Sequence, residues 1–532
     1  MKLRGSGRLL HNVLRQAAEE DCDAPLVTFL DDRMYTRGEL WDATLRVACA
    51  LQRLGVQPGD RVALFISNKV EFLSGWLGIS AAGAVAVPLN TAMRGDVLAY
   101  MLNLTEPRVL IGEAEFAPQI EEVTSDASYL ETYVWLGEAP VARGVRYADF
   151  MEGSVPVEPA GGEPWDLVGI FFTSGTTGPS KGVMWSHNMA IYMSESASFI
   201  MDYRPDDVLL TCLPLFHANA LFVSFFAAVV HRCRVVVAPR FSASQFWRQV
   251  SEVEATTVNL LGSMAPILWR QEPSEWEQAH KLRLALVIPS PIGHYDEFEA
   301  RFNVKCTELY GLTDANLPLG VPAGENRPGS CGVPVPGWEC MIVDDHDEPV
   351  EPGAPGELVV RPTLPFVGQL GYWRMPEATV KGWQNLWFHT GDLMRRDEDG
   401  WYYFLDRLKD AIRRSGENIS SFEVEQVLLS HPAVFEAAVY AVPADLSEDE
   451  VMAAVVLEPG KEATPEDILA WCEPRLAYFA VPRYVDIKPS LPKTQTEKVQ
   501  KQALRSEGVT AATFDRGPSG RRMRERLQES TP

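Results

Sequence analysis

The sequence is poor in cysteine and in positive charge and has no long hydrophobic run, and each shortage excludes a class of protein. Eight cysteines in 532 residues include no Cys-x-x-Cys pair. Neither a disulfide scaffold nor a structural zinc site is therefore expected, whereas free thiols in a reducing compartment are. The most apolar stretch, 220–230, is too short to span a bilayer. Leu9 and Leu10 are followed at once by polar residues, unlike a signal peptide. We expect a cytoplasmic protein.

The shortage of positive charge bears on possible partners. The chain has 48 Lys and Arg against 72 Asp and Glu, which gives a formal net charge of −24. Proteins that bind nucleic acids or anionic membranes do so with clustered Lys and Arg, which replace the counterions of phosphate groups. We therefore expect no nucleic-acid partner and no membrane partner.

The length and composition of the chain are typical of a globular protein with three or four structural units. Thr36 and Glu39 form a capping box before a helical pattern that ends at Gly55. Strand-like runs alternate with such helical patterns, which predicts largely parallel sheets covered by helices. The strand-like runs are 61–67, 84–90, 167–172, 234–239 and 282–290.

The residue composition changes after Gly320. Proline, glycine and short β-rich runs dominate residues 322–365, which predicts an antiparallel, barrel-like unit. Further on, 401–405 is predicted as a strand and 406–410 as a charged connector. Ser420 then starts a predicted helix, followed by two strand-like runs.

These patterns predict an α/β protein with a small α+β domain at its C-terminal end. The N-terminal domain, 1–407, is expected to combine two αβ sheet subdomains with a β-barrel-like subdomain. The C-terminal domain is expected at 408–516. The polar, basic stretch 517–532 has no apolar period and is expected to be a disordered tail.

The strongest local signal is the segment FFTSGTTGPSKGV, residues 171–183. A hydrophobic strand runs into a loop rich in Gly, Ser and Thr that ends in Lys181. Its glycines let backbone N–H groups approach an anion, and the hydroxyls and the ammonium add further donors. This pattern predicts a polyphosphate-binding loop, the alternative being a flexible surface loop. It is not a Walker A loop, which needs Gly-Lys-Ser/Thr after four intervening residues.

Six further segments accompany this loop, and together they resemble the adenylate-forming enzymes. That family includes acyl-CoA synthetases, firefly-type luciferases and peptide-synthetase adenylation domains, and the resemblance extends from about residue 9 to residue 501. The segments are LPLFHANA, ELYGLTD, PGELVVR, WFHTGDL, DRLKDAIRRSGENISSFEVE and LPKTQTEKVQK. The sequences of these segments are most similar to those of the crotonobetaine/carnitine-CoA ligase-like branch. The resemblance does not carry that substrate over, because no carboxylate or aromatic cage for a trimethylammonium group can be located.

The resemblance implies an ATP-dependent acid–thiol ligase that uses Mg²⁺ and coenzyme A. A carboxylic acid would first be converted to acyl-AMP with release of pyrophosphate, and coenzyme A would then displace AMP. Two other functions stay open: loading of the acyl group onto a carrier protein, and a non-catalytic nucleotide-binding homologue. The expected partner is a small-molecule carboxylic acid, and a homo-oligomer is compatible with the sequence.

The resemblance also assigns residues to the nucleotide. Tyr310 is suited to stacking on a purine, and Thr313 offers a hydroxyl to a phosphate. Asp392, at a predicted strand end, would accept both ribose hydroxyls, with Arg407 adding a ribose or phosphate contact; alone, either would be interpreted as a solvated surface group. The full set implied is Thr173, Ser174, Gly175, Thr176, Thr177, Gly178, Lys181, Ser290, Pro291, Tyr310, Gly311, Thr313, Asp392 and Arg407.

Three departures from the family pattern accompany these assignments. Asp314 stands where the family usually has Glu, so Mg²⁺ would be held directly or through water; alone, it would be interpreted as a helix cap. Glu497 replaces the glycine that usually precedes the family's catalytic lysine. The turn beside the adenine reads VIPSPIG (287–293) instead of a Gly-Gly-Ala-Pro-like turn, so Ser290 and Pro291 are expected in that wall.

The catalytic residues implied are Lys498, Lys181 and Thr313. The Lys498 ammonium would bridge the attacking carboxylate and the α-phosphate, stabilising charge that grows in the transition state. Lys493 and Lys501 are alternatives nearby in the sequence. Lys409 matches the hinge between two orientations of the C-terminal domain, and Gly416 matches the glycine that lets the pantetheine arm approach the backbone.

The acid pocket is expected to be lined by His217, Asn219, Phe222, Gly262 and Met264. His217 holds the family's pocket-gating position, although a lone His on an apolar face is more often a satisfied core residue. Small residues at 218, 220 and 262 suggest room for a medium-sized or bulky apolar acid.

Overall fold

The computed structural model describes residues 6–125, 127–138, 144–173, 180–262, 264–290, 294–408, 410, 412–414, 417–443, 449–493 and 499–517. Its internal contacts divide the chain into two units. The first unit comprises Met1–Thr173, Pro179–Cys340 and Val360–Phe388, and the second includes Met341–Val359 and the chain from His389 onward. The boundary predicted between 407 and 408 stays a prediction, as does the predicted tail, whose residues from 518 onward lie outside the described ranges.

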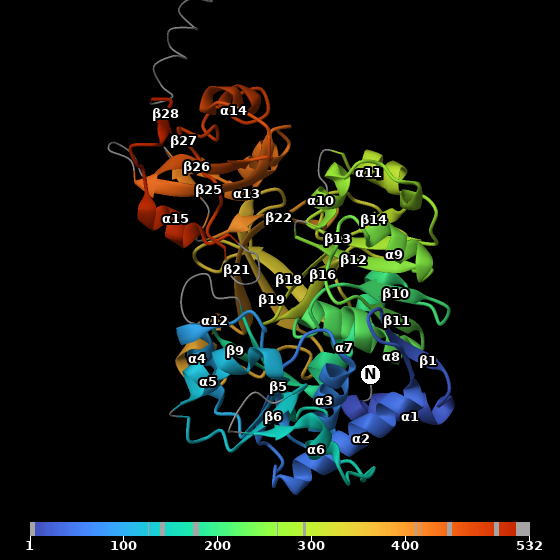
Figure 1. The fold of residues 1–532 in the computed structure, drawn as a ribbon. Coiled ribbons are helices and arrows are strands. Elements are labelled where there is room, and N and C mark those ends of the chain that lie inside the picture. Colours follow the sequence, from blue (N-terminus) through green and yellow to red (C-terminus); the bar gives the residue numbers. More distant parts are fainter. Residues whose placement is uncertain are drawn as a thin grey trace, which may run out of the picture. The chain divides into compact units, whose positions relative to one another are not determined.

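The first unit contains two seven-stranded sheets, as the alternating pattern predicts. One sheet has the order β14-β13-β12-β10-β11-β1-β2, with every neighbouring pair parallel except β1 and β2 (Figure 1). Its strands are β1 (Pro25–Phe29), β2 (Met34–Thr36), β10 (Val208–Thr211), β11 (Arg234–Val237), β12 (Thr257–Leu261), β13 (Leu284–Ile288) and β14 (Lys305–Thr307). The strands predicted within 234–239 and 282–290 are confirmed as β11 and β13.

The other sheet has the order β7-β6-β5-β3-β4-β8-β9 and is parallel except for β8 and β9. Its strands are β3 (Arg61–Phe65), β4 (Val85–Pro88), β5 (Val109–Glu113), β6 (Thr132–Leu136), β7 (Val145–Arg146), β8 (Leu167–Phe172) and β9 (Gly182–Ser186). The runs predicted as strands at 61–67, 84–90 and 167–172 are confirmed. The segment predicted to bind polyphosphate lies between β8 and β9.

Helices connect and cover these strands. Helix α2 begins after Thr36, whose hydroxyl accepts from the Glu39 N–H while the Glu39 carboxylate accepts from the Thr36 N–H, confirming the predicted capping box. The helices are α1 (Leu10–Glu20), α2 (Arg37–Arg53), α3 (Val70–Ala81), α4 (Gly95–Thr105), α5 (Ala117–Thr124), α6 (Tyr147–Met151), α7 (His187–Met201), the π-helix η3 (Asn219–Phe225), α8 (Phe226–His231), α9 (Phe246–Glu252), α10 (Met264–Arg270), α11 (Tyr295–Phe302) and α12 (Pro376–Gly382).

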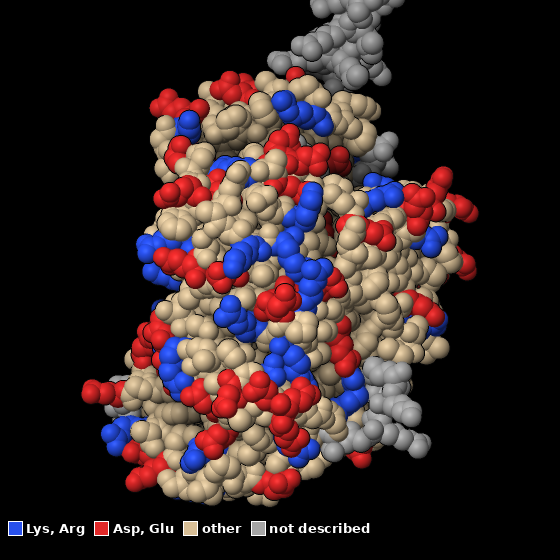
Figure 2. Space-filling model, turned by 90° about the vertical axis from the view of Figure 1, so that its right-hand side faces the viewer, with Lys and Arg blue, Asp and Glu red and all other residues tan. Residues whose placement is uncertain are grey.

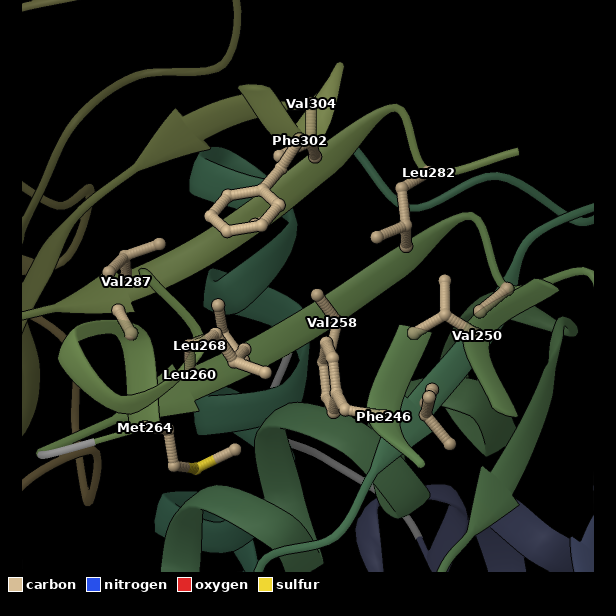
Figure 3. Packing of buried hydrophobic residues seen from close by; sticks show 14 of the residues in the cluster. Phe246, Val250, Val258, Leu260, Met264, Leu268, Leu282, Val287, Phe302 and Val304 are labelled. Atoms are coloured by element: carbon tan, nitrogen blue, oxygen red, sulfur yellow. The ribbon is translucent and has the colours of Figure 1, made fainter. Parts of the chain in front are cut away.

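One face of strand β12 belongs to a buried core. Val258 and Leu260 pack with Phe246 of α9, Leu268 of α10 and Phe302 of α11 (Figure 3). Side chains alternate between the two faces of a strand. The residue between Val258 and Leu260 therefore points to the other face of the sheet, toward η3.

A second core is built from stacked aromatic rings. Trp76, Phe171, Trp185 and Phe222 are all buried and come from α3, β8, β9 and η3. Their ring centroids lie 4.9 to 6.0 Å apart. Burying large aromatic side chains stabilises each contact by more than their area alone would give, so this cluster joins both sheets of the first unit into one core.

The β-rich character predicted for residues 322–365 is confirmed, and β17 in this stretch pairs antiparallel with β16, whereas the barrel-like arrangement stays a prediction. Strands β15, β16 and β17 form one sheet, while β18, β19, β21 and β20 follow one another in a second sheet in which β22 also pairs with β21. The strands are β15 (Leu309–Leu312), β16 (Asn316–Gly320), β17 (Val333–Pro334), β18 (Trp338–Val343), β19 (Pro355–Pro362), β20 (Trp383–Gln384), β21 (Trp387–Arg396) and β22 (Tyr402–Arg407).

The C-terminal part of the second unit is the predicted α+β segment. The strands β25, β26, β27 and β28 form a sheet with buried clusters on both faces. Ser420 caps helix α13 by accepting from the Glu423 N–H, as expected. The elements are β23 (Ile412–Arg414), β24 (Glu417–Ile419), α13 (Ser421–Leu429), β25 (Val434–Pro443), β26 (Asp449–Leu457), α14 (Pro465–Cys472), β27 (Tyr484–Ile487), α15 (Lys501–Glu507) and β28 (Phe514–Asp515).

The surface and the cysteines complete the picture. On the face shown in Figure 2, Lys and Arg side chains are interspersed with Asp and Glu. All eight cysteines are free thiols. None of the helices within the described ranges combines the length and the apolar character that crossing a bilayer requires.

Candidate active site

Several predicted site residues follow the carboxyl ends of the first sheet's parallel strands. His217 and Asn219 follow β10, Gly262 follows β12, Ser290 follows β13, and Tyr310 comes shortly after β14. Because β10, β12, β13 and β14 are parallel neighbours, these ends share one edge of the sheet. Ligands of open parallel sheets bind beyond the carboxyl ends of the strands. This carboxyl edge is therefore the candidate active site.

The two ends of the predicted phosphate loop are tied to each other. The Thr173 N–H donates to the Lys181 carbonyl at 3.0 Å, and the Lys181 N–H donates to the Thr173 hydroxyl at 3.3 Å. These bonds continue the antiparallel pairing of β8 with β9. Ser174, Gly175, Thr176, Thr177 and Gly178 lie outside the described residues.

The Lys181 side chain lies beside the ELYGLTD segment. Its Nζ is 4.5 Å from the centre of the Tyr372 ring, a cation–π contact. The Tyr372 hydroxyl in turn donates to Asp314 Oδ1 at 2.5 Å. Burial and the neighbouring Asp314 carboxylate raise the pKa of Tyr372, so its proton stays on the phenol. Lys181 and Asp314, predicted separately, are thus brought together through a tyrosine.

Thr313 is connected to the aromatic core. The Trp185 indole N–H donates to the Thr313 carbonyl at 2.9 Å. The same indole stacks on Phe222, with the ring centroids 5.2 Å apart. One rigid ring therefore connects the segment predicted to contact phosphate with a residue predicted for the acid pocket.

Tyr310 and Ser290 lie in a buried polar setting. The Ser290 hydroxyl donates to Glu308 at 2.6 Å and accepts from the Gly329 N–H at 3.2 Å. Burial raises the pKa of Glu308 to about 7, against the opposing effect of the Ser290 hydrogen bonds. Tyr310 itself is buried and Gly311 is exposed. Pro291, the other residue predicted in this wall, lies outside the described residues.

The predicted acid-pocket residues differ widely in exposure. His217 is exposed and packs edge-to-face on Phe216 at 4.7 Å, so the alternative of a satisfied core histidine is wrong. Phe222 is fully buried in the aromatic core and Met264 is buried in the β12 core. Gly262 is exposed and adopts a positive φ of 60°.

Asp392 and Arg407 lie in the second unit, on paired strands. The prediction that Asp392 lies at a strand end is wrong. Asp392 lies in the middle of the ten-residue strand β21. The strand continues past it because residues 392–396 pair with β22 through a register shift after Leu393. Asp392 is buried and stands opposite Arg407, whose Nε lies 2.7 Å from its Oδ1. Asp392 is therefore not the solvated surface group that it would suggest alone, whereas Arg407 is paired with it but exposed.

The predicted charged connector 406–410 also needs correction. Asp406 and Arg407 belong to strand β22, and Asp406 is buried. Its carboxylate accepts from the backbone N–H groups of Arg407 and Ser421, which is why a charged residue is accommodated there. Burial raises the pKa of Asp406, while Lys501 and these N–H donors oppose that rise.

The two lysines considered as alternatives to Lys498 both have acidic partners. Lys493 forms an ion pair with Glu436. Lys501 Nζ lies 2.8 Å from Glu425 Oε1 and donates to the Ser421 hydroxyl at 2.6 Å. Lys498 itself lies outside the described residues, as do Lys409 and Gly416.

Two residues of this site escaped the sequence analysis. Trp185 occupies a strand position typical of core residues, and Tyr372 lies 58 residues after Asp314, its hydrogen-bond partner. A strand tryptophan and a loop tyrosine carry no local signal for such contacts. The partnership arises only from the packing of the first unit.

The residues present fit a Mg²⁺ ion only in a limited way. Among the described residues there is no group of three or more His, Cys, Asp and Glu side chains that could hold a metal. Asp314 supplies one half-buried carboxylate. Mg²⁺ is commonly bound through one or two carboxylates plus substrate phosphates and water, so this donor set suits a magnesium ion that arrives with a nucleotide.

Comparison with known proteins decides the family. A family model described as AMP-binding enzyme matches residues 14–373, and the model of its C-terminal domain matches residues 423–498. The chain belongs to the AMP-binding enzyme family. Crotonobetaine/carnitine–CoA ligases of Citrobacter koseri and Proteus mirabilis are each 31% identical, covering 89% of this chain and 93% of theirs.

Solved structures of this AMP-binding enzyme's relatives agree. The anthranilate CoA ligase AuaEII in complex with anthranoyl-AMP matches at a TM-score of 0.88 and 26% identity, over 95% of this chain and 98% of that one. ATP-bound MatB from Rhodopseudomonas palustris matches at 0.84 and 27%, over 93% and 98%. This AMP-binding enzyme is accordingly an ATP-dependent acyl-CoA ligase: it activates a carboxylic acid as an acyl adenylate and transfers the acyl group to coenzyme A.

Proposed function

We propose that the acid and ATP meet at the carboxyl edge of the first sheet and that the residues predicted from the sequence carry the chemistry there. The carboxylate oxygen forms a bond to the α-phosphorus, and the bond to pyrophosphate breaks. In the second half-reaction the thiol sulfur bonds to the acyl carbon, AMP leaves, and the thiol proton is released. The contact of Lys181 with Tyr372, and of Tyr372 with Asp314, is the observation that carries the proposal.

The sequence assigns separate groups of residues to the phosphates, the adenine and the ribose of the nucleotide. The loop from Thr173 to Lys181 would hold the phosphates, because its donors suit a polyphosphate, and Thr313 would contact the α-phosphate. Tyr310 would line the adenine, and Asp392 with Arg407 would bind the ribose. A charged acceptor such as Asp392 makes strong hydrogen bonds to hydroxyl donors.

Magnesium and the lysine of the C-terminal domain complete this proposal. Asp314 would hold Mg²⁺, which supplies charge neutralisation on the phosphates when bound. Lys498 would stabilise the growing charge between carboxylate and phosphate. Lys493 and Lys501 have acidic partners of their own, which supports the assignment of Lys498. Lys409 would serve as the hinge and Gly416 as the approach for coenzyme A.

The predicted pocket residues favour an acid other than the one named for the crotonobetaine/carnitine–CoA ligases. A quaternary ammonium acid such as crotonobetaine or carnitine would need an anionic or aromatic partner for its cation. The predicted pocket residues His217, Asn219, Gly262 and Met264 include no carboxylate, and the Phe222 ring is buried in the aromatic core. We therefore assign a carboxylic acid without a cationic group. A cytoplasmic location is part of the proposal, since eight free thiols suit a reducing compartment.

The test separates the two half-reactions. Purified protein should catalyse acid-dependent exchange of pyrophosphate into ATP, and coenzyme A should then yield a thioester. Lys498→Ala should slow exchange at least 100-fold while thioester formation from preformed acyl-AMP falls much less. Lys493→Ala is the matched control and should lose far less. Equal loss of both half-reactions in Lys498→Ala would contradict the assigned role.

The hinge assignment has its own test. Lys409→Pro fixes φ at that position and removes a backbone donor. If Lys409 is the hinge, thioester formation should fall while acid-dependent exchange is retained. Unchanged thioester formation would contradict the hinge.

A further inference from the structure

A pair of amide side chains joins the start of η3 to strand β12 at the carboxyl edge. Asn259 Nδ2 lies 2.8 Å from Asn219 Oδ1 and 3.2 Å from Ser224 Oγ. Asn259 and Ser224 are buried, whereas Asn219 is half-buried. Both hydrogens of the Asn259 amide are thus committed to protein acceptors, and the Asn219 oxygen receives one of them.

The remaining donors of Asn219 have a different status. Its amide nitrogen makes no hydrogen bond to any described residue. An amide N–H group that is removed from water without an acceptor is costly, because its desolvation is not repaid. A ligand that covers Asn219 must therefore supply an acceptor or weaken its own binding.

Two residues that neighbour this pair in the sequence are exposed to solvent. Gly262, directly after β12, is exposed, and a Cβ built on it would meet no atom within 4 Å. His217, two residues before Asn219, is exposed as well. Asn259 faces this side because its neighbours Val258 and Leu260 point into the opposite core (Figure 3). The pair thus belongs to the side of the sheet on which the acid is assigned.

The amide N–H donors of Asn219 determine which kind of substrate group can bind to it. An ammonium would present donors to donors, and a bare hydrocarbon would leave the amide N–H groups unsatisfied. A hydroxyl, carbonyl or ether oxygen matches them. We propose that the acid activated by this enzyme carries, beyond its carboxylate, a neutral hydrogen-bond acceptor to which the Asn219 amide donates. Asn259, which also bonds Ser224, positions the Asn219 amide for this contact. This inference rests on the proposed function, because Asn219 selects an acid only if this edge binds it.

The test uses pairs of acids that differ in one oxygen substituent. Acid-dependent ATP–pyrophosphate exchange is measured on the full-length protein with benzoate and the three hydroxybenzoates, cinnamate and 4-hydroxycinnamate, and hexanoate and 6-hydroxyhexanoate. In at least one pair, kcat/KM should favour the oxygen-bearing acid by about tenfold or more, because a site built to hydrogen-bond a substrate oxygen discriminates against its absence.

Variants of Asn219 decide whether this residue is responsible. Asn219→Leu, similar in size but without donors, should reduce the ratio of kcat/KM within that pair to about twofold. Asn219→Ala gives the same readout with a different packing change, should Asn219→Leu fail to fold. Asn103→Leu, at an exposed amide of α4, is the matched control and should keep the ratio.

The possible outcomes separate this inference from the proposed function. A collapsed ratio in the Asn219 variants, with the ratio kept in Asn103→Leu, supports the inference. Exchange without preference in the unmodified protein, or a preference that survives both Asn219 variants, overturns the inference and leaves the proposed function standing. No acid-dependent exchange with any acid of the panel counts against the proposed function itself.

Discussion

Arg407 Nε lies 2.7 Å from Asp392 Oδ1, directly across the antiparallel strands β22 and β21. Asp392 is only 1% exposed on its side chain, whereas Arg407 is 47% exposed. A buried carboxylate needs charged or hydrogen-bonding partners to offset its desolvation. The arginine therefore offsets part of the desolvation of this carboxylate and fixes its orientation.

Substitution of either member should weaken ATP binding. Asp392→Asn is expected to raise the KM for ATP about tenfold or more, because hydrogen bonds to a charged group contribute about 1.5–3 kcal/mol. Arg407→Gln should raise it too, and the double variant should be little worse than the worse single one, since residues in direct contact are not additive. Arg396→Gln, exposed at the end of the same strand, is the control. Fully additive effects in exchange kinetics would argue against a coupled pair.

The contact between Tyr372 and Asp314 predicts a change in magnesium dependence. Tyr372→Phe keeps the ring beside Lys181 but removes the hydrogen bond that holds the carboxylate. Loss of one hydrogen bond of about 1 kcal/mol should raise the Mg²⁺ concentration for half-maximal activity about fivefold. Asp314→Asn should raise it more, and removal of Mg²⁺ with a chelator should abolish exchange.

A matched control exists for this experiment. Tyr129 donates to Asn103 away from the carboxyl edge, so Tyr129→Phe should leave the Mg²⁺ titration unchanged. An unaltered titration in both Tyr372→Phe and Asp314→Asn would remove Asp314 from the magnesium assignment.

Trp185 is expected to couple packing to nucleotide use. Trp185→Phe keeps an aromatic ring against Phe222 but loses the bond to the Thr313 carbonyl. We expect a loss of stability of about 1–2 kcal/mol from the smaller ring and the unpaired carbonyl, together with a several-fold lower kcat in exchange. Trp76→Phe trims the same ring size from the same core and should cost stability without the kcat effect. An equal kcat effect in both variants would assign the loss to packing alone.

Two buried histidines predict sensitivity to acid. Burial and the nearby Arg15 lower the pKa of His11 to about 4, against the opposing Ser80 bond, and burial and the nearby His11 lower that of His187 to about 3. Both are neutral when folded and become protonated near pH 6.5 when unfolded. Stability is therefore fully present above pH 6.5 and decreases as the pH falls toward 4, by about 2 kcal/mol per histidine at pH 5.

The measurement is the unfolding midpoint of the full chain at pH 7.5 and pH 5. His11→Gln should be less sensitive to the change of pH than the unmodified protein, because one titrating group is removed. His346→Gln, at an exposed position, should keep the full difference. A His11→Gln variant with undiminished sensitivity would show that other groups dominate the acid transition.

Much of the fold could be predicted because its periodic patterns are local. The run Leu167–Phe172 coincides with β8, and the Thr36 capping box sets the start of α2. The position of Asp392 could not be predicted in this way. A Gly-Asp pair signals a strand end, yet β21 continues because its partner β22 supplies hydrogen bonds across a register shift. Pairing between strands is a tertiary property that a local pattern does not contain.

The same distinction between local patterns and tertiary contacts decides which site residues could be predicted. Ser290, Tyr310 and Asn219 could be assigned from the sequence because each lies in or beside a segment that resembles the family, and the parallel sheet brings those segments to one edge. Tyr372 could not be found, because its hydroxyl meets Asp314 only through packing between distant parts of the chain. Asp406 was interpreted as part of a charged connector because its charge is visible in the sequence. The backbone N–H groups that donate to its buried carboxylate are not visible there.

Strand β12 assigns alternate positions to different tasks. Val258 and Leu260 pack into the buried core, while Asn259 points to the other face of the sheet and hydrogen-bonds Asn219 and Ser224. A substitution at Asn259 is therefore expected to act through its hydrogen-bond partners Asn219 and Ser224 rather than through the core that Val258 and Leu260 share.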